Sequence, residues 1–436
     1  MDLFLDVTGK TFYNYSMEKP ILNVAMISYH TCPLATLGGK DTGGMNVYVR
    51  ELTRHLGKIG VHVDVFTRSQ DEHVPRILHD LGCGNRVVHV PAGPEFPLPK
   101  KQLASYIPQF TEGIQRFASG KNIRYDLIHS HYWMSGIAAE TLKHKWNVPM
   151  VHMFHTLGLM KNRVATRKDE MEGEYRISGE RQVIKAADRI VAATAAEQSQ
   201  LEFLYKAPSQ KLSIIPPGVD VDHFYCIPPD ESKAAIDLCA DCRMFLYVGR
   251  IEPLKGVDTL IKAIAILKEK GLMTQKPYSL SIIGGDPDAS MLEMNAEMAR
   301  LQRLCHDLGL DEMIVFLGKR NQDFLPYYYS AAEAVIVPSH YESFGMVALE
   351  AMACGTPVVA SQVGGLAFLV QDGITGFVVP DGDPEILADR LTRLILEPDL
   401  SERLGQQAAA YAQDYAWPKI AARILQLYQM IPPRKM

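Results

Sequence analysis

The sequence predicts an α/β protein made of two doubly wound parallel sheets that face each other across a cleft. Three observations lead to this fold class. Short apolar runs rich in β-branched residues alternate with helical patterns along nearly the whole chain, the alternation stops once near the middle, and it then starts again. Strands that are apolar along their length and separated by helices belong to parallel sheets covered on both faces. A chain of 436 residues is long enough for two such units.

The first half of the chain contains seven of the expected strands. They cover residues 21–28, 61–67, 87–92, 126–132, 149–155, 189–194 and 212–217. Between the first two, apolar residues recur at helical spacing from Met45 to Ile59, and Gly60 can end that helix. A strand, a helix and a second strand in this order form the repeating unit of a doubly wound sheet.

The second half repeats the pattern after a pause between residues 216 and 243, where proline pairs and acidic residues are typical of a linker. Six more strands are expected at residues 244–249, 279–285, 314–318, 334–339, 357–361 and 376–380, and helices at 256–270, 288–308, 345–354 and 384–397. The expected organisation is a first domain at 1–218, a linker at 219–243, a second domain at 244–415 and, at 416–436, a C-terminal helix that returns to the first domain.

Charge and composition exclude several classes of protein. The net charge of −5 gives no overall attraction to nucleic acid or to an anionic membrane. No apolar run approaches the length of about 18 residues that a membrane-spanning helix needs, and the start of the chain lacks a secretory pattern. The seven scattered cysteines favour free thiols in a reducing compartment, and the pair Cys239 and Cys242 lacks the second pair that a metal site needs. We therefore expect a cytoplasmic protein.

Two glycines, Gly43 and Gly44, follow the first strand and precede the helix that begins near Met45. Glycine lets backbone N–H groups approach an anion closely, and a helix N-terminus adds partial positive charge at the same place. One interpretation is a phosphate site, and the other is a tight turn without a ligand.

A second candidate anion site follows the first strand of the second domain. Gly249 and Arg250 come at the end of that strand, and Lys255 precedes the next helix. Two cations on a loop above the carboxyl edge of a sheet suit a diphosphate, which a guanidinium binds as a fork. The alternative is a solvated loop with salt bridges to Glu252 or Asp258.

Two carboxylates flank a helix start later in the second domain. Glu342 lies in the loop after a strand, Phe344, Gly345 and Met346 supply free N–H groups at the start of the helix, and Glu350 lies more than one turn inside it. This order can hold hydroxyls, a phosphate and further hydroxyls. The alternative for Glu350 is a buried glutamate bonded to backbone, although an idle carboxylate among apolar neighbours is costly.

Several separated motifs resemble one family. They are the glycine pair, GR followed by K at 249–255, E-x7-E with an internal FGM at 342–350, and the segments GTPVVAS and DGITGFVVPDGD. In this order and on these elements, they resemble the retaining nucleotide-sugar glycosyltransferases of family 4. That family has the GT-B fold, in which two Rossmann-like domains face an interdomain cleft. The resemblance covers nearly all of the chain from about residue 21 onward.

The resemblance implies a role for each motif. Arg250 and Lys255 would neutralise the donor diphosphate, Glu342 would meet the hexose hydroxyls, and Glu350 would bind the ribose. The implied donor-binding residues are Gly43, Gly44, Gly249, Arg250, Lys255, Glu342, Phe344, Gly345, Met346, Val347 and Glu350. The implied catalytic residues are His155, which would approach the transferred sugar, Arg250, Lys255 and Glu342.

No metal or other cofactor is expected for the chemistry, because Arg250 and Lys255 can absorb the charge of the departing nucleotide. The two DxD triplets, at 220–222 and 381–383, are interpreted as structural. A double displacement would need a carboxylate nucleophile at the anomeric carbon, and the pattern offers no obvious candidate. The family is described as reacting on one face of the sugar, with the leaving phosphate taking the proton of the acceptor.

The first domain resembles two subfamilies with phosphorylated acceptors, the inositol-phosphate N-acetylglucosaminyltransferases of mycothiol synthesis and the sucrose-phosphate synthases. Matching the first places the acceptor-phosphate ligands at Lys100, Tyr132, Thr156 and Arg176. Gly158 favours the second, whereas Met45 departs from it. We expect UDP-glucose and fructose 6-phosphate as substrates, giving sucrose 6-phosphate, with UDP-GlcNAc and inositol phosphate as the alternative. The first domain would then bind the acceptor and the second domain the nucleotide sugar.

Three other functions remain open. A nucleotide-sugar epimerase would need no acceptor-phosphate site. A transferase acting on a lipid or polysaccharide would need a basic amphipathic face, and the local basic cluster KNRVATRK at 161–168 has few apolar neighbours. A binding protein would not need the complete set of cations and carboxylates. We expect small-molecule substrates, no nucleic-acid partner and no integral membrane association.

Overall fold

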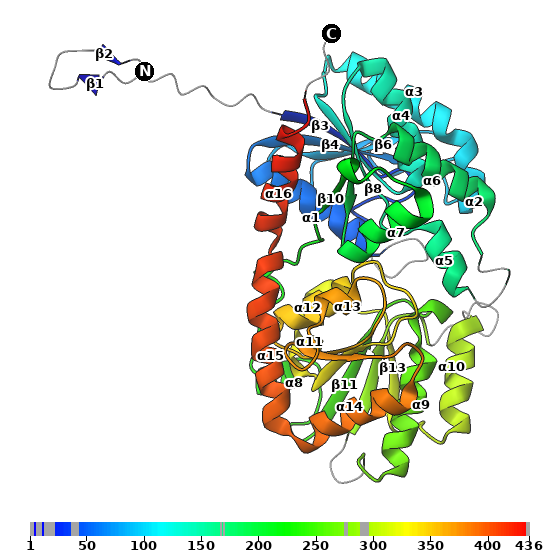
Figure 1. Ribbon diagram of the computed structural model, residues 1–436, viewed down its shortest axis with the longest axis vertical. Helices are drawn as coiled ribbons and strands as arrows, with labels where there is room; N and C mark the ends of the chain where they lie inside the picture. Colours follow the sequence, from blue (N-terminus) through cyan, green and yellow to red (C-terminus); the bar gives the residue numbers. More distant parts are fainter. Residues whose placement is uncertain are drawn as a thin grey trace.

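The computed structural model describes residues 4–5, 11–12, 22–35, 43–165, 168, 171–273, 278–287 and 296–432. Figure 1 shows two α/β units stacked along the long axis of the molecule, with helices α15 and α16 running along one side of both. The predicted fold class, two doubly wound sheets, is confirmed. A short antiparallel pair, β1 (Phe4–Leu5) and β2 (Thr11–Phe12), precedes the first unit.

The first unit contains an eight-stranded sheet in the order β10-β9-β8-β7-β3-β4-β6-β5. Its strands are β3 (Leu22–Ile27), β4 (Val61–Arg68), β5 (Ile77–Leu78), β6 (Arg86–Val90), β7 (Leu127–His131), β8 (Met150–Met153), β9 (Arg189–Ala192) and β10 (Leu212–Ile214). All neighbours are parallel except β5, which pairs antiparallel with β6. Because β3 pairs with β4 on one side and β7 on the other, the strand order reverses there, and ligands of such sheets bind beyond the carboxyl ends of the strands at that point.

Helices cover both faces of this sheet. They are α1 (Gly44–Lys58), α2 (Lys100–Leu103), α3 (Ile107–Gly120), α4 (Trp133–Trp146), α5 (Gly158–Val164), α6 (Glu174–Ala186) and α7 (Ala195–Tyr205). The helix predicted after the glycine pair begins at Gly44 and ends at Lys58, as the apolar spacing indicated.

The second unit contains a six-stranded parallel sheet in the order β13-β12-β11-β14-β15-β16. Its strands are β11 (Arg243–Val248), β12 (Tyr278–Ile283), β13 (Ile314–Gly318), β14 (Ala334–Val337), β15 (Val358–Ser361) and β16 (Gly376–Val379). Its helices are α9 (Val257–Glu269), α10 (Ala296–Asp307), α11 (Leu325–Ala331), α12 (Met346–Ala353), α13 (Leu366–Leu369), α14 (Pro384–Leu396) and α15 (Pro398–Ala412). The first part of the helix predicted at 288–308 lies outside the described residues.

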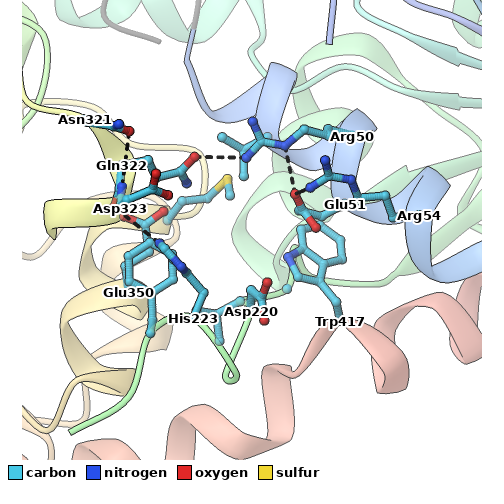
Figure 2. Close-up of a pocket in the computed structure, with 15 residues that line it drawn as sticks. Arg50, Glu51, Arg54, Asp220, His223, Asn321, Gln322, Asp323, Glu350 and Trp417 are labelled. Atoms are coloured by element: carbon cyan, nitrogen blue, oxygen red, sulfur yellow. Dashed lines mark hydrogen bonds and ion pairs between the residues drawn. The ribbon is translucent and has the colours of Figure 1, made fainter. Parts of the chain in front are cut away.

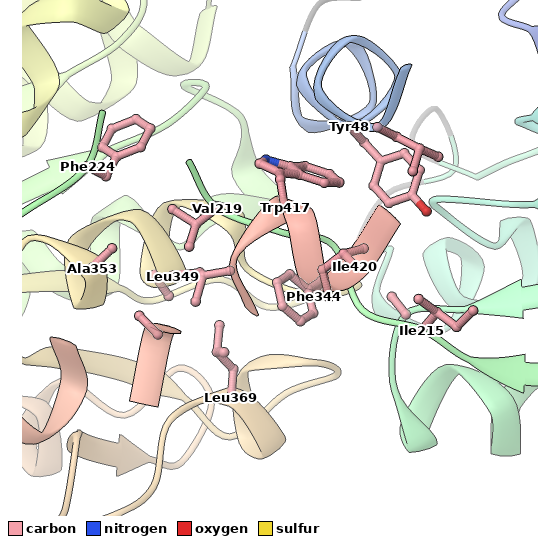
Figure 3. Packing of buried hydrophobic residues seen from close by; sticks show 14 of the residues in the cluster. Tyr48, Ile215, Val219, Phe224, Phe344, Leu349, Ala353, Leu369, Trp417 and Ile420 are labelled. Atoms are coloured by element: carbon pink, nitrogen blue, oxygen red, sulfur yellow. The ribbon is translucent and has the colours of Figure 1, made fainter. Parts of the chain in front are cut away.

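The two units are joined by the segment after β10, which contains α8 (Pro229–Ala235), and by α16 (Trp417–Gln429), which packs against α1. Trp417 is 1% exposed and lies between the two units (Figure 3). Its ring lies 5.5 Å from that of Tyr48 on α1, and it fits against Gly218, where a Cβ atom would come within 2.6 Å of the indole. One continuous apolar cluster therefore runs from the first sheet through Trp417 to α12.

The cysteines correct one expectation. Cys239 and Cys242 form a disulfide just before β11, so the prediction that all cysteines are free thiols is wrong for this pair, whose three-residue spacing allows direct closure. The other five cysteines are free. Within the described residues, no helix combines the length and the apolar character needed to cross a membrane.

Candidate active site

A cavity of about 340 Å³ lies where the carboxyl edges of the two sheets face each other. Its wall contains all of the predicted catalytic residues and all but one of the predicted donor-binding residues. The residues from the first unit include Gly43, Gly44, Lys100, Tyr132, His155 and Thr156, and those from the second include Gly249, Arg250, Lys255, Glu342, Phe344, Gly345, Met346 and Val347. The structure therefore brings together segments that lie up to about 300 residues apart in the chain.

Figure 2 shows a second cavity, of about 330 Å³. It adjoins the first cavity, because Met346 lines both. Glu350 lies in this second cavity, together with several polar residues that the sequence did not single out. They are Arg50, Glu51, Arg54, His223, Asn321, Gln322 and Asp323, and Asp220 of the first DxD triplet lines the cavity with them. A ligand that extends over Met346 can occupy both cavities. The combined space is elongated and suits a long molecule such as a nucleotide sugar.

The two predicted cations reach the first cavity from the loop after β11. Lys255 Nζ lies 2.5 Å from Glu342 Oε2, and Arg250 pairs with Glu252 at 2.8 Å between Nη1 and Oε1. The predicted alternative of a salt bridge to Glu252 is thus present, yet both cations also line the cavity. Each side chain keeps some exposure, 43% for Arg250 and 20% for Lys255, so their charge is available to an anion in the cavity.

The loop before α12 is fixed by close backbone contacts. Gly345 has a φ of 106°, in the left-handed region that favours glycine, and a Cβ atom there would come within 2.5 Å of Leu366. The Gly365 N–H donates to the Glu342 carbonyl at 3.0 Å. Glu342 pairs with Lys255, and Gly345, Met346 and Val347 line the cavity at the start of α12, where the first N–H groups have no partner inside the helix.

Glu350 is buried inside α12 and accepts a hydrogen bond from the Tyr329 hydroxyl at 2.9 Å. Burial raises the pKa of Glu350 to about 7, although the hydrogen bond from Tyr329 and the charge of Arg50 oppose the rise. The alternative prediction was a glutamate bonded to backbone, whereas the hydrogen bond that Glu350 accepts comes from the Tyr329 side chain. The carboxylate faces a polar cavity.

The glycine pair lies at the boundary between the two units. The Gly43 N–H donates to Asn46 Oδ1 at 3.0 Å, and the Asn46 amide in turn donates to Thr31 Oγ1 at 2.6 Å. A Cβ atom on Gly44 would come within 3.2 Å of the Met346 sulfur. The small residue at position 44 thus lets the start of α1 approach the start of α12 across the cavity.

The predicted acceptor residues are arranged in two layers. Lys100 Nζ lies 5.8 Å from the centre of the Tyr132 ring, and both residues line the cavity with Thr156. Arg176 does not line it and is 1% exposed, because its guanidinium donates to Glu172, Glu180 and Thr156 behind the wall. In this arrangement Arg176 holds the Thr156 side chain through a 3.0 Å bond to Oγ1.

The sequence missed a cation on the same wall. Lys161 on α5 lines the cavity and pairs with Glu172 at 3.2 Å. Burial and the neighbouring charge of Arg176 lower the pKa of Lys161. Lys161 belongs to the basic cluster KNRVATRK at 161–168, which sequence analysis noted. The sequence alone does not show that Lys161 is the member of this cluster that lines the cavity.

The strand ends on this side of the cavity carry unusual backbone conformations. Tyr132 after β7 has a φ of 73° and His155 after β8 a φ of 62°, values that non-glycine residues seldom adopt and that concentrate at functional sites. His155 Nε2 lies 3.0 Å from His131 Nδ1, and the Ser343 hydroxyl of the second unit donates to the His155 carbonyl at 2.6 Å.

The aspartates of the two DxD triplets take part in local contacts. Asp220 Oδ1 accepts from the Asp222 N–H at 3.1 Å, Asp381 pairs with His340, and Asp383 caps the start of α14 by accepting from the Ile386 N–H at 3.0 Å. Within the described part of the chain, no group of three or more His, Cys, Asp or Glu side chains is placed to hold a metal ion.

Comparison with known proteins identifies the family. A family described as "Glycosyltransferase Family 4" matches residues 42–223, and one described as "Glycosyl transferases group 1" matches residues 230–411. The chain is 40% identical over 406 residues to a D-inositol 3-phosphate glycosyltransferase of Actinosynnema mirum, a match covering 93% of this chain and 96% of the relative. The chain belongs to the family 4 glycosyltransferases of the GT-B fold.

Other similar proteins include both inositol-phosphate glycosyltransferases and a sucrose-phosphate synthase. A D-inositol 3-phosphate glycosyltransferase of Thermomonospora curvata is 39% identical over 419 residues, covering 94% of this chain and 96% of that protein. A solved sucrose-phosphate synthase from Thermosynechococcus elongatus is 34% identical, with a TM-score of 0.84 and a coverage of 94% and 98% of the two chains. The catalytic domain of starch synthase IV from Arabidopsis thaliana shares the fold alone, with a TM-score of 0.70 and 17% identity.

Proposed function

We propose that this glycosyltransferase moves a hexosyl group from a nucleotide sugar to a small phosphorylated acceptor, with retention at the anomeric carbon. The observation that carries the proposal is a single cavity with a cationic group on each of its facing walls. Arg250 and Lys255 lie on one wall, and Lys100 and Lys161 lie on the other. Two separate cationic groups suit two phosphorylated substrates, a donor diphosphate and an acceptor phosphate.

The donor roles follow the two cavities. Arg250 and Lys255, with the first-turn amides of α12, stabilise the negative charge that develops on the leaving diphosphate. Glu342 accepts hydrogen bonds from hexose hydroxyls, and Glu350 accepts them from the ribose. The nucleobase then lies in the second cavity, near the side-chain amides of Asn321 and Gln322, which can pair with its polar edge.

The acceptor roles belong to the opposite wall. Lys100, Tyr132 and Thr156 donate to the acceptor phosphate, and Arg176 contributes by holding Thr156 in place. On this proposal the domain at 1–218 binds the acceptor and the domain at 244–415 binds the nucleotide sugar. His155 lines the same cavity and contacts the transferred sugar.

Transfer on one face of the sugar fits the charges on the cavity wall. A double displacement needs a carboxylate nucleophile next to the anomeric carbon. Among the described residues that line the first cavity, Glu342 is the only carboxylate, and it is paired with Lys255. The leaving phosphate itself is then the base that takes the proton of the acceptor hydroxyl.

The favoured substrates are UDP-glucose and fructose 6-phosphate, which would give sucrose 6-phosphate. The similarity to the sucrose-phosphate synthase supports this choice. Gly158 supports it less than its sequence position suggested, because its N–H donates to Glu180 and a Cβ atom there would come within 2.6 Å of Ile177, so packing alone explains the glycine. Transfer from UDP-GlcNAc to inositol phosphate is the second candidate, and the identity of about 40% with the inositol-phosphate enzymes favours it.

The test is a matrix of donors against acceptors, with release of the nucleoside diphosphate as the signal. UDP-glucose and UDP-GlcNAc are each combined with fructose 6-phosphate, D-inositol 3-phosphate and the two unphosphorylated acceptors. We expect release to require a phosphorylated acceptor. Equal release with fructose and with fructose 6-phosphate would contradict the acceptor-phosphate site. Conversion of the donor sugar in the absence of any acceptor would indicate an epimerase.

A further inference from the structure

Four histidines are buried together at the ends of β7 and β8, beneath the cavity. His129, His131 and His152 are each 0% exposed, and His155 lies next to them on the cavity wall. A burial of this kind disfavours the charged imidazolium, and it lowers the pKa of His155 to about 3. All four rings are therefore neutral at ordinary pH, and each carries one N–H and one lone pair.

The three fully buried rings share a pattern of hydrogen bonds. In each, Nδ1 has a partner, whereas Nε2 is buried and has none within the described residues. His152 Nδ1 lies 2.8 Å from Ser130 Oγ, His129 Nδ1 lies 2.7 Å from the Tyr428 hydroxyl, and His131 Nδ1 lies 3.0 Å from His155 Nε2.

His152 shows which nitrogen carries the proton. The Ser130 hydroxyl donates to the Val151 carbonyl at 3.3 Å, so its oxygen is left to accept from His152 Nδ1–H. The unpartnered Nε2 is then a lone pair. This is the cheaper arrangement, since buried N–H groups without an acceptor are rarer in proteins than buried acceptors without a donor.

The same reasoning applies to His131, whose Nε2 is also buried without a partner among the described residues. With its proton on Nδ1, His131 donates to His155 Nε2. A neutral imidazole that accepts at Nε2 must carry its own proton on Nδ1. We propose that His131 is a positioning residue that fixes His155 as an Nδ1–H donor towards the cavity, where it donates to an oxygen of the transferred sugar.

This inference deepens the proposed function and rests on it for its catalytic consequence. A neutral N–H donor can bind a sugar hydroxyl without placing positive charge beside an anomeric centre that becomes oxocarbenium-like in the transition state. The opposite tautomer would present a lone pair, which binds a hydroxyl only by accepting a hydrogen bond from it. The direction of the hydrogen bond between His131 Nδ1 and His155 Nε2 thus decides whether His155 offers the sugar a donor or an acceptor.

The direct test is imidazole NMR on the full-length enzyme labelled with ¹⁵N-histidine, which reports which ring nitrogen carries the proton. The His155 signals are assigned with His155→Gln. We expect a proton on Nδ1 and none on Nε2 in the unsubstituted enzyme. In His131→Leu the donor is lost and the His155 ring should become a mixture of the two tautomers. His131→Asn keeps an N–H donor near the Nδ1 position and should restore the original signals.

His152→Leu is the matched control. It removes a histidine of equal burial from the neighbouring strand, but one whose Nδ1 bonds to Ser130 and not to His155. Both leucine variants lose packing in the same region, so a purely structural effect would appear in both. We expect the His155 tautomer to change only in His131→Leu.

Kinetics test the consequence for transfer. We expect His131→Leu to lower kcat about tenfold with little change in the KM of the donor, and His131→Asn to lie within about threefold of the original enzyme. A His155 ring protonated at Nε2 in the unsubstituted enzyme, or an unchanged tautomer in His131→Leu, would overturn the inference. Because NMR needs no turnover, an enzyme that fails the donor and acceptor matrix would refute the proposed function and leave this result standing.

Discussion

The ion pair between Lys255 and Glu342 joins the proposed diphosphate and hexose positions of the donor site. Replacing Lys255 by Ala removes a cation next to the proposed position of the diphosphate and also leaves Glu342 without its partner. We predict that kcat falls about 100-fold, the loss typical of one group that stabilises a developing anion. Initial rates of nucleotide release measure it. Lys262→Ala is the control, because Lys262 pairs with Asp258 on the surface of α9, outside the cavity wall, and its rate should stay within about twofold.

Glu350 leads to a prediction about pH. Since its pKa is raised to about 7, the carboxyl group of the free enzyme is mostly protonated at pH 6 and mostly ionised at pH 8. Ribose hydroxyls donate best to the ionised form, so the affinity for UDP should increase as pH rises through about 7. Calorimetric titrations with UDP at both pH values measure the change.

The matched variant for this prediction is Glu350→Gln, which cannot ionise but keeps the shape of the side chain. Ionisation of UDP itself changes over the same range and affects both proteins equally, so the difference between them isolates the carboxyl group. The effect of rising pH on stability has the opposite sign. Between about pH 4.5 and 7, Glu350 holds a proton in the folded state that it lacks in the unfolded state. Its contribution to the free energy of unfolding therefore falls as pH rises. An identical pH dependence of UDP affinity in both proteins would refute the role of Glu350.

At the level of elements, the N-terminus of α7 is held by side-chain hydrogen bonds. Thr194 Oγ1 accepts from the Glu197 N–H at 3.1 Å, and Glu197 Oε2 accepts from the N–H of Ala193, which lines the cavity. We predict that Thr194→Ala lowers the free energy of unfolding by about 1 kcal/mol. Denaturant unfolding measures it. Ser199→Ala, on the exposed side of the same helix, should change stability by less than about 0.5 kcal/mol, and an equal loss in both variants would contradict the cap.

The sheets could be predicted from the sequence because each central strand is buried on both faces and reads as a short apolar run. β5 was missed, since it has two residues and lies antiparallel at the sheet edge. The position of Lys255 and Glu342 on the cavity wall could be predicted for a local reason. Each lies in the loop between a strand and the next helix, and the carboxyl ends of all parallel strands meet at the same edge of the sheet.

The rest of the site depends on contacts that no local pattern encodes. Arg50 and Gln322 meet only because the two units pack together, and they are 272 residues apart in the chain. Arg176 lies behind the cavity wall because Glu172 and Glu180 hold its guanidinium there. A sequence shows that these residues can donate or accept, but their orientation is decided by tertiary neighbours.

At the scale of the whole molecule, the packing around Trp417 joins the two units. The Val219 N–H donates to the Tyr415 carbonyl and the Trp417 N–H to the Val219 carbonyl, so the segment after β10 and the start of α16 lie side by side. The chain thus crosses between the units at two adjacent points. We therefore expect any motion of one unit against the other to be a rotation about this region, which would open or close the two cavities that Met346 lines.

Two polar contacts away from Trp417 hold the units together in the described state. Arg50 Nη2 donates to Gln322 Oε1 at 2.9 Å, and Ser343 Oγ donates to the His155 carbonyl at 2.6 Å. Each contact is expected to contribute about 1 kcal/mol, so losing both should shift the equilibrium between closed and open forms about 30-fold towards the open form. We predict that Arg50→Met combined with Ser343→Ala increases the radius of gyration of the free enzyme, measured by small-angle X-ray scattering.

The control for this prediction replaces the neighbouring Arg54 by Met. Arg54 lines the same cavity as Arg50, but it pairs with Glu51 on its own helix and makes no contact across the units among the described hydrogen bonds. Adding UDP with the phosphorylated acceptor should return the double variant to the compact form, because ligands that bind both walls favour closure. If the double variant scatters like Arg54→Met both with and without these ligands, the two contacts do not control closure.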